Sequence, residues 1–159
     1  MTLRIAITRA EPEAHVTARR VQELGGVPIV APLLTIERRA FDTNIDGVQA
    51  ILFTSTNGVF AFAEATRERP PQVITVGNAT AEAAVKAGFN NVRSANGDVG
   101  ALAEVAGKVL QPNGGKVLHV SGEHTAGDLV GALTQAGYRA EQRLSFESKQ
   151  VEKMPPGLG

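Results

Sequence analysis

Hydroxyl and amide side chains gather in four short segments, each between an apolar run and a helical pattern. The segments are Thr8–Glu11, Thr54–Gly58, Gly77–Thr80 and Ser121–Thr125. Ser, Thr and Asn at a helix start cap backbone N–H groups. Free N–H groups beside them can also bind carboxylates or phosphates without a basic side chain. Capping explains any single segment, but four segments of one character favour binding sites for anions.

The composition agrees with local anion sites better than with a basic surface. Lys plus Arg and Asp plus Glu number 16 each, so the formal net charge is zero. This balance argues against broad binding to nucleic acid or to an anionic membrane. The chain has no cysteine, which excludes disulfides, thiolate metal sites and a cysteine nucleophile. Arg9 is the one strong cation in the four segments, and it fits either an anion contact or an ordinary surface position.

Motifs for other chemistries are missing or weak. No GxGxxG follows the first apolar run and no GxxxxGK[ST] occurs, so dinucleotide and P-loop sites are disfavoured. Thr54–Gly58 has only a faint likeness to a flavin phosphate loop. His15 and His119 fall in a helical and an apolar pattern, so we expect both to be structural, whereas His124 could contact a ligand. No Ser–His–Asp or paired-carboxylate arrangement can be assigned from spacing.

Alternating strands and helices account for most of the chain. Short apolar runs, typical of parallel strands covered on both faces, occur at Leu3–Thr8, Ala50–Ser55, Gln72–Gly77 and Lys116–Ser121. Helical patterns cover Glu13–Leu24, Gly58–Thr66, Thr80–Ala87, Val99–Leu110 and Thr125–Ala136. Three of these patterns end at a Gly that precedes a further strand-like run. The alternation predicts an α/β fold with a doubly wound parallel sheet, in which ligands bind at the carboxyl ends of the strands.

The chain divides unevenly into one complete lobe and one partial lobe. Residues 1–30 form a βαβ piece of an incomplete first lobe, 31–41 an extended linker, 42–141 a complete α/β lobe, and 142–159 a returning linker and chain end. A βαβ unit of about 30 residues buries too little surface to be stable alone. It could dock on the main lobe, self-associate with another chain, or belong to a truncated sequence, and we expect truncation. Without a signal peptide or membrane-length apolar stretch, we expect a cytoplasmic protein.

Several segments together resemble uroporphyrinogen-III synthase. They are IAITRAEPEA, APLLTIE, FTSTNGV, VGNATAEAAVKAGF and VSGEHTAGDLVGALTQAGYRAEQRLSFES, in order along essentially the whole chain. The resemblance implies two flavodoxin-like lobes with a cleft between them, joined by two extended linkers. It implies closure of the linear tetrapyrrole hydroxymethylbilane to uroporphyrinogen III, with inversion of ring D and loss of water. It also implies no metal or organic cofactor, and a small-molecule polycarboxylate partner instead of nucleic acid or membrane.

The resemblance also assigns residues. Positions that match the family's substrate-binding loops are Thr8, Arg9, Thr54, Ser55, Asn57, Gly77, Thr80, Ser121 and Gly122. Ser121 stands where many members have Arg, and Phe146 stands where many have a Tyr proposed to assist loss of the hydroxyl. Phe cannot donate a proton, so the catalytic residue stays unassigned. We expect Tyr138, the only tyrosine, to be a packing residue. We expect little activity from the 159-residue form, and the alternative is a non-catalytic module that binds a polycarboxylate or tetrapyrrole.

Overall fold

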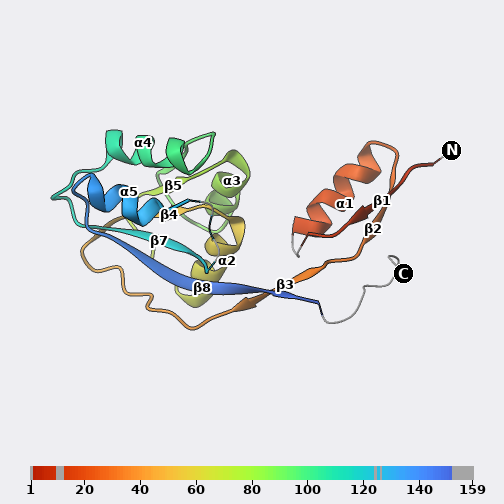
Figure 1. The fold of residues 1–159 in the computed structure, drawn as a ribbon, viewed down its shortest axis with the longest axis horizontal. Helices are drawn as coiled ribbons and strands as arrows, with labels where there is room; N and C mark the ends of the chain where they lie inside the picture. Colours follow the sequence, from red (N-terminus) through yellow and green to blue (C-terminus); the bar gives the residue numbers. More distant parts are fainter. Residues whose placement is uncertain (1, 10–12, 124, 126, 152–159) are drawn as a thin grey trace. The chain divides into compact units, whose positions relative to one another are not determined.

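A computed structural model describes residues 2–9, 13–123, 125 and 127–151. The chain separates into two compact units, which are described individually (Figure 1). Unit 1 comprises Met1–Glu37 and Glu147–Gly159, and unit 2 comprises Arg38–Phe146. Unit 2 holds most of the helices and strands and therefore most of the core.

Unit 2 is built on parallel strands. They are β4 (Val48–Phe53), β5 (Val73–Thr75), β6 (Val92–Ser94), β7 (Lys116–Gly122) and the first part of β8 (Ala140–Gln150). Their spatial order is β8-β7-β4-β5-β6, and every pair among them is parallel. If these five strands are numbered 1 to 5 along the chain and read from β6 to β8, the order is 3-2-1-4-5. Flavodoxin itself has the order 2-1-3-4-5. The predicted doubly wound parallel architecture is confirmed.

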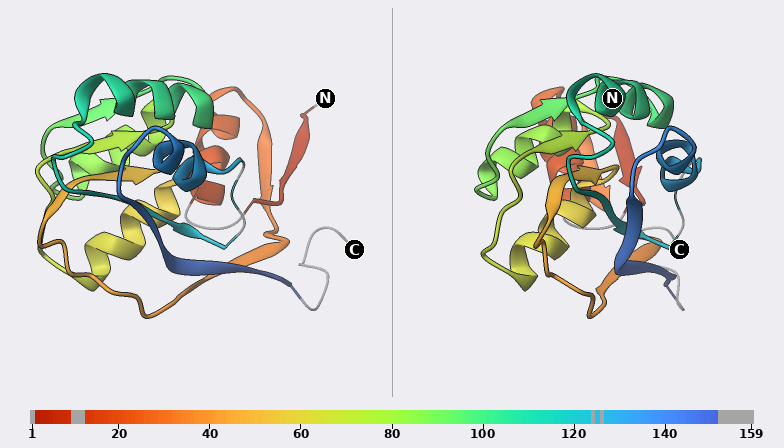
Figure 2. Two further views of the ribbon diagram at one scale, coloured as in Figure 1. Left: turned by 60° about the vertical axis from the view of Figure 1, so that its left-hand side comes forward. Right: turned by 90° about the vertical axis from the view of Figure 1, so that its left-hand side faces the viewer.

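Helices cover both faces of this sheet (Figure 2). On one face, α2 (Thr56–Ala65) and α3 (Asn78–Lys86) contribute to a buried cluster with Ile51 and Phe53 of β4. On the other face, α4 (Val99–Val109) and α5 (Leu129–Gln135) contribute to a second cluster with Ala50 and Leu52 of the same strand. Since both faces of β4 are covered, its side chains are apolar on both sides, as in parallel sheets generally.

Some helices begin at residues other than those expected. Helix α2 begins at Thr56 instead of Gly58, because Ser55 has an extended backbone and its side chain accepts a hydrogen bond from the Asn57 N–H. Helix α5 begins only at Leu129, because the Asp128 side chain caps it by accepting from the Gly131 N–H. Local capping therefore decides both starts.

Unit 1 contains β1 (Arg4–Ile7), α1 (Glu13–Glu23) and β2 (Val27–Val30), with β1 and β2 paired in parallel. Its core is small and is formed by Ile7, Ala14, Ala18 and Val21, with Ile5 and Val30 packed against them. Unit 1 also includes most of β3 (Leu34–Arg38), which neighbours β8 in the strand order, and Val151 N donates to Leu33 O. The exposed large hydrophobic side chains of unit 1 include Leu3, Val16, Leu24, Val27, Leu33 and Leu34.

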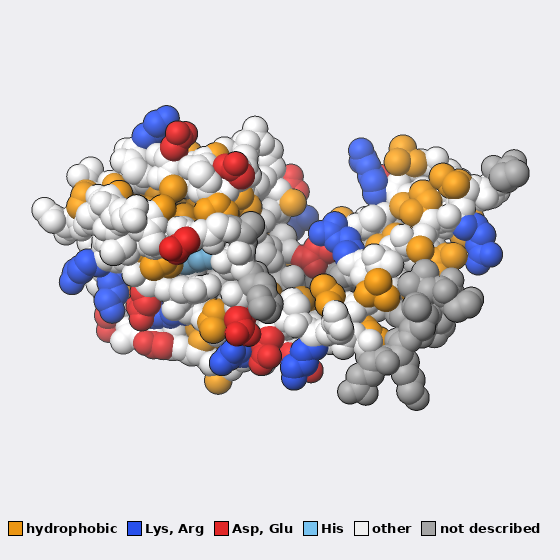
Figure 3. Space-filling model, viewed as in Figure 1, with side chains coloured by type: hydrophobic (Ala, Val, Ile, Leu, Met, Phe, Trp, Pro, Cys, Tyr) orange, Lys and Arg blue, Asp and Glu red, His pale blue; other side chains and the backbone are white. Residues whose placement is uncertain are grey.

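Charged groups are mixed on the surface. On the face that Figure 3 shows, basic and acidic side chains are interspersed over unit 2. Within the described residues, no helix has the length and apolar character needed to cross a bilayer.

Candidate functional site

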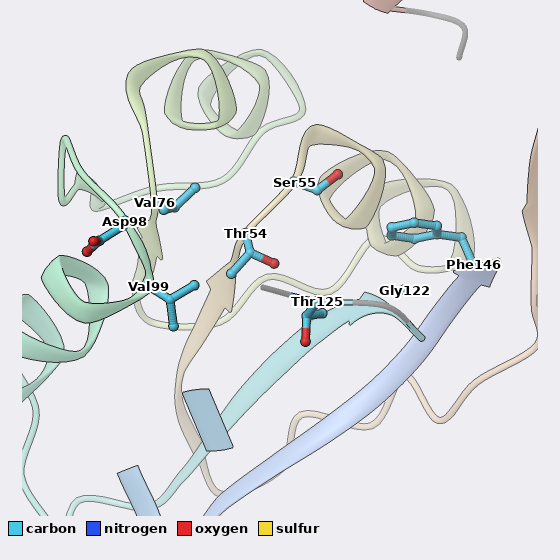
Figure 4. A pocket seen from close by; sticks show the side chains of 8 residues that line it. All are labelled: Thr54, Ser55, Val76, Asp98, Val99, Gly122, Thr125 and Phe146. Carbon is cyan, nitrogen blue, oxygen red and sulfur yellow. The ribbon is translucent and has the colours of Figure 1, made fainter. Parts of the chain in front are cut away.

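The topology opens a crevice at the carboxyl ends of β4 and β7. From β4 the chain proceeds to β5 and β6 on one side, and then returns to place β7 on the other side of β4. The loops after β4 and β7 therefore leave in opposite directions, and such a switch point is where doubly wound proteins bind ligands. A pocket of about 250 Å³ lies here (Figure 4), lined by Thr54, Ser55, Val76, Asp98, Val99, Gly122, Thr125 and Phe146.

The loop after β4 supplies two hydroxyls to this pocket. Ser55 is the N-cap of α2, and its Oγ accepts from the Asn57 N–H at 3.1 Å. Thr54 Oγ1 lies 2.9 Å from Nε2 of His119, a residue of β7. Ser55 therefore serves as a cap and also lines the pocket, so the two interpretations of this segment are compatible.

The close approach of α2 to β7 brings the two loops together. A Cβ atom placed on Gly58 would lie 2.5 Å from the carbonyl oxygen of Val120 and 3.2 Å from the Phe53 ring. Only a residue without a side chain allows the first turn of α2 to lie against the β7 backbone. Gly58 thereby sets the position of Ser55 relative to Gly122.

Ser121 lies inside the sheet instead of lining the pocket. It is 1% exposed, its hydroxyl donates to the Gly122 carbonyl at 3.0 Å, and it accepts from Nε2 of Gln142 at 2.8 Å. The Ser145 hydroxyl donates to the Ser121 carbonyl. These bonds fix the end of β7 against β8, and thus hold Gly122 at the pocket.

Phe146 lies directly beside Gly122. A Cβ atom on Gly122 would be 2.6 Å from the Phe146 ring, so the glycine makes room for the aromatic side chain. Phe146 is 7% exposed and lines the pocket, with its ring directed toward the Gly122 side of it (Figure 4). The position where the resemblance expects a tyrosine is therefore part of the pocket. Tyr138, by contrast, is buried and donates to the Leu110 carbonyl at 3.1 Å, which confirms its packing role.

Three lining residues were not anticipated from the sequence: Val76, Asp98 and Val99. Asp98 caps α4, since its carboxylate accepts from the Ala101 N–H at 2.9 Å. In Figure 4 the carboxylate points away from Thr54, so its charge is not directed at the hydroxyls. An Asp immediately before the helical pattern at Val99 was the available signal, because Asp is a favoured N-cap residue.

The remaining predicted residues lie elsewhere. Gly77 is the N-cap of α3 and Thr80 is buried in that helix. Asn57 is partly buried, and its side-chain oxygen is enclosed without a hydrogen-bond partner. Arg9 belongs to unit 1, where it donates to the Thr17 hydroxyl at 3.3 Å.

Thr8 is likewise in unit 1, where its carbonyl accepts from the Leu33 N–H. His124, which we predicted could contact a ligand, lies outside the described residues. Of the predicted set, the pocket therefore brings together Thr54, Ser55 and Gly122.

Among the described residues, the pocket lining carries one acidic side chain, Asp98, and no basic side chain. Burial lowers the pKa of His119 to about 4, so its imidazole is uncharged at neutral pH. No group of three or more His, Cys, Asp or Glu side chains suited to a metal occurs in the described part of the chain. The lining offers hydroxyls and apolar surface, and the carboxylate of Asp98 points away from the Thr54 hydroxyl.

The strand order defines a doubly wound α/β protein with a pocket at its switch point. A family model described as uroporphyrinogen-III synthase HemD matches residues 15–156. The chain belongs to the uroporphyrinogen-III synthase family, as its sequence motifs predicted.

Solved structures of this family share the fold. The uroporphyrinogen-III synthetase of Helicobacter pylori is 16% identical, with a TM-score of 0.62, covering 97% of this chain and 65% of that one. A mutant uroporphyrinogen III synthase of Thermus thermophilus is 18% identical, with a TM-score of 0.62, covering 94% and 64%. The wild-type Thermus thermophilus enzyme in another crystal form is 18% identical, with a TM-score of 0.53, covering 94% and 63%.

At these identities the likeness is one of fold, and the chain spans less than two thirds of the length of these structures. No curated protein matches the chain significantly.

Proposed function

We propose that the protein acts as a uroporphyrinogen-III synthase in haem biosynthesis, a lyase that cyclises hydroxymethylbilane with loss of water and inversion of ring D. Family membership supports the reaction class. The single observation that carries the proposal is the meeting of Thr54, Ser55 and Gly122 with Phe146 in one switch-point pocket. These residues come from the loop after β4, the end of β7 and β8, and sequence motifs alone assigned them to one site. In the structure they are neighbours.

In this proposal the polypeptide orients the substrate. The hydroxyls of Thr54 and Ser55, which lie at the N-terminal end of α2, bind a substrate carboxylate. The apolar lining from Val76, Val99 and Phe146 accommodates a pyrrole ring. Further carboxylates of the substrate bind near Asn57 and Gly77, which are partly exposed, whereas Thr80 is buried and supports the start of α3. Ser121 contributes by holding the end of β7.

Orientation is the main catalytic contribution that this lining can make. The hydroxyl of the bilane departs as water and leaves an azafulvene, which is attacked by the substituted carbon of ring D to give a spiro intermediate. That intermediate rearranges and closes as isomer III. Holding ring D for this attack is a proximity effect. Phe146 has no proton to give to the departing hydroxyl, so another group or water supplies it.

The test is the isomer composition of the product. Wild-type protein with hydroxymethylbilane should raise the proportion of uroporphyrinogen III over the isomer I that forms spontaneously. Isomer composition is informative even at low turnover, because spontaneous closure does not invert ring D. Isomer I alone would contradict the proposal. Thr54→Val should lower the proportion of isomer III, whereas Thr134→Val, which changes an exposed threonine of α5, serves as its matched control.

A second candidate is a non-catalytic module that binds a tetrapyrrole polycarboxylate. The specific observation that favours it is Phe146, which places a ring without a hydroxyl in the pocket. Tight binding of uroporphyrin III together with an unchanged isomer composition would support this module over the enzyme.

A further inference from the structure

His119 is a polar residue in an otherwise apolar part of β7. Its neighbours Leu118 and Val120 belong to the cluster beneath α2 and α3, so the alternation of a strand places His119 on the α4 and α5 side. The side chain is only 3% exposed. Burying an imidazole is less favourable than burying an apolar side chain of similar size. A buried imidazole is therefore expected to have a hydrogen-bond partner.

That partner is Thr54. The distance from His119 Nε2 to Thr54 Oγ1 is 2.9 Å, an ordinary hydrogen bond across the β4–β7 pair. Thr54 lines the pocket, and Figure 4 shows its hydroxyl on the side that faces β7. The bond therefore links a buried side chain to a pocket residue 65 positions away in the sequence.

The direction of this bond determines what Thr54 can offer a ligand. A hydroxyl has one proton, and a carboxylate can only accept hydrogen bonds. If Thr54 donates to His119, no proton remains for a carboxylate in the pocket. If Nε2–H donates to Thr54, the threonine proton is free. The imidazole is uncharged at neutral pH, so its tautomer selects between the two arrangements.

We propose that His119 is a positioning residue that donates its Nε2–H to Thr54 and thereby directs the Thr54 hydroxyl proton toward a ligand carboxylate. This inference rests on the proposed binding of a polycarboxylate at the switch-point pocket. It assigns to the buried histidine a role in anion specificity without contact between His119 and the ligand.

The first test is the tautomer of His119 in the free protein. Two-dimensional long-range ¹H–¹⁵N spectra of the imidazole at pH 7 should show the Nε2–H form, with His119→Gln used to assign the signals. The Nδ1–H form would overturn the proposal, because Nε2 would then accept the threonine proton.

The second test compares an octa-acid with its methyl ester, which has the same ring system but no charged carboxylate. Uroporphyrin III carries eight carboxylates, whereas its octamethyl ester carries none. His119→Phe should weaken binding of the acid by about tenfold, the scale of one hydrogen bond to a charged group, and leave binding of the ester unchanged. His119→Gln, which keeps an amide donor, should retain affinity for the acid. Thr54→Val should match His119→Phe, and the double variant should lose no more than either alone.

A matched control separates positioning from packing. Tyr138→Phe removes another buried hydrogen bond, to Leu110 at the far end of α4, and should change neither affinity. Equal losses for acid and ester in His119→Phe, or equal effects of His119→Phe and Tyr138→Phe, would overturn the proposal. Wild-type protein that yields only isomer I would instead contradict the proposed function, while the tautomer and the acid-to-ester difference still decide the role of His119.

Discussion

Gly58 and Val120 are in such close contact that no side chain fits between them. A Cβ on Gly58 would lie 2.5 Å from the Val120 carbonyl oxygen, which belongs to the neighbouring strand β7. The backbone of β7 cannot shift without disturbing its pairs with β4 and β8. This one contact therefore fixes the start of α2 and, with it, the hydroxyl side of the pocket.

Gly58→Ala should destabilise the protein by about 1–3 kcal/mol, the usual cost of overpacking. It should also weaken ligand binding, since α2 must move away from Gly122. Gly107→Ala is the control, because a Cβ there meets nothing within 4 Å and Ala is the better helix former. Urea denaturation of both variants measures the effect. A neutral Gly58→Ala would mean that α2 can shift without penalty.

Acid should destabilise the protein through His119. In the unfolded chain the imidazole binds a proton below its ordinary pKa of 6.5, whereas in the folded protein it does so only near pH 4. The unfolded state therefore binds more protons between these values, and stability falls as pH is lowered from 6.5 to 4. The full effect is about 3 kcal/mol. Above pH 6.5 this histidine contributes no pH dependence.

The measurement is the free energy of unfolding from urea curves at several pH values. His119→Gln should remove this part of the pH dependence, because glutamine does not titrate. His15→Gln serves as the control, because it shows whether the change in pH dependence is specific to the loss of His119. An identical pH dependence in wild type and His119→Gln would show that His119 protonates as readily in the folded protein as in the unfolded chain.

Phe146→Tyr should raise the rate of isomer III formation by about tenfold or more, within the range of general acid catalysis. The reason is that the new phenol would lie in a pocket whose lining offers hydroxyls but no aromatic proton donor. Phe60→Tyr, in α2 and outside the pocket lining, controls for an added hydroxyl. Equal rates for Phe146→Tyr and wild type would mean that proton donation at this position does not limit the reaction.

Arg143 should be a principal stabilising residue of the segment that enters unit 2. The side chain is 8% exposed, and its Nη1 donates to the carbonyls of Asp42 and Asn44. Arg143→Met should therefore cost about 2–4 kcal/mol, because two partly buried hydrogen bonds from a charged donor are lost. Arg139→Met, at an exposed position on the adjacent turn, should stay within about 0.5 kcal/mol of wild type. Thermal and urea unfolding measure the difference.

Unit 1 should promote self-association. Its exposed apolar side chains include Leu24 and Val27, and β1 and β2 form a sheet of two strands covered by one helix. Leu24→Glu should lower the association constant measured by sedimentation at rising protein concentration, since apolar surface drives such contacts. Val85→Glu, at an exposed apolar position in unit 2, is the matched control. Monomeric wild-type protein at all concentrations would contradict this prediction.

Much of the fold could be predicted because its signals are local. Apolar runs marked β1, β4, β5 and β7, and glycines after helices marked the strands that follow, as at Gly88 before β6. The predicted starts of α2 and α5 were less accurate, because several neighbouring polar residues could serve as the N-cap and only the structure identifies Ser55 and Asp128. The expectation that His119 is structural was correct as to burial, but its partner Thr54 is distant in sequence and had no local signal.

The sequence by itself determined the kinds of element, their order along the chain, and the family. Periodicity, caps and short motifs depend on residues a few positions apart, so they can be seen in one chain. Only the tertiary structure decided which loops meet. Thr54, Gly122 and Phe146 come together because β7 inserts between β4 and β8, and strand order arises from the packing of whole faces. The pocket is therefore a property of the sheet order, and no single segment contains it.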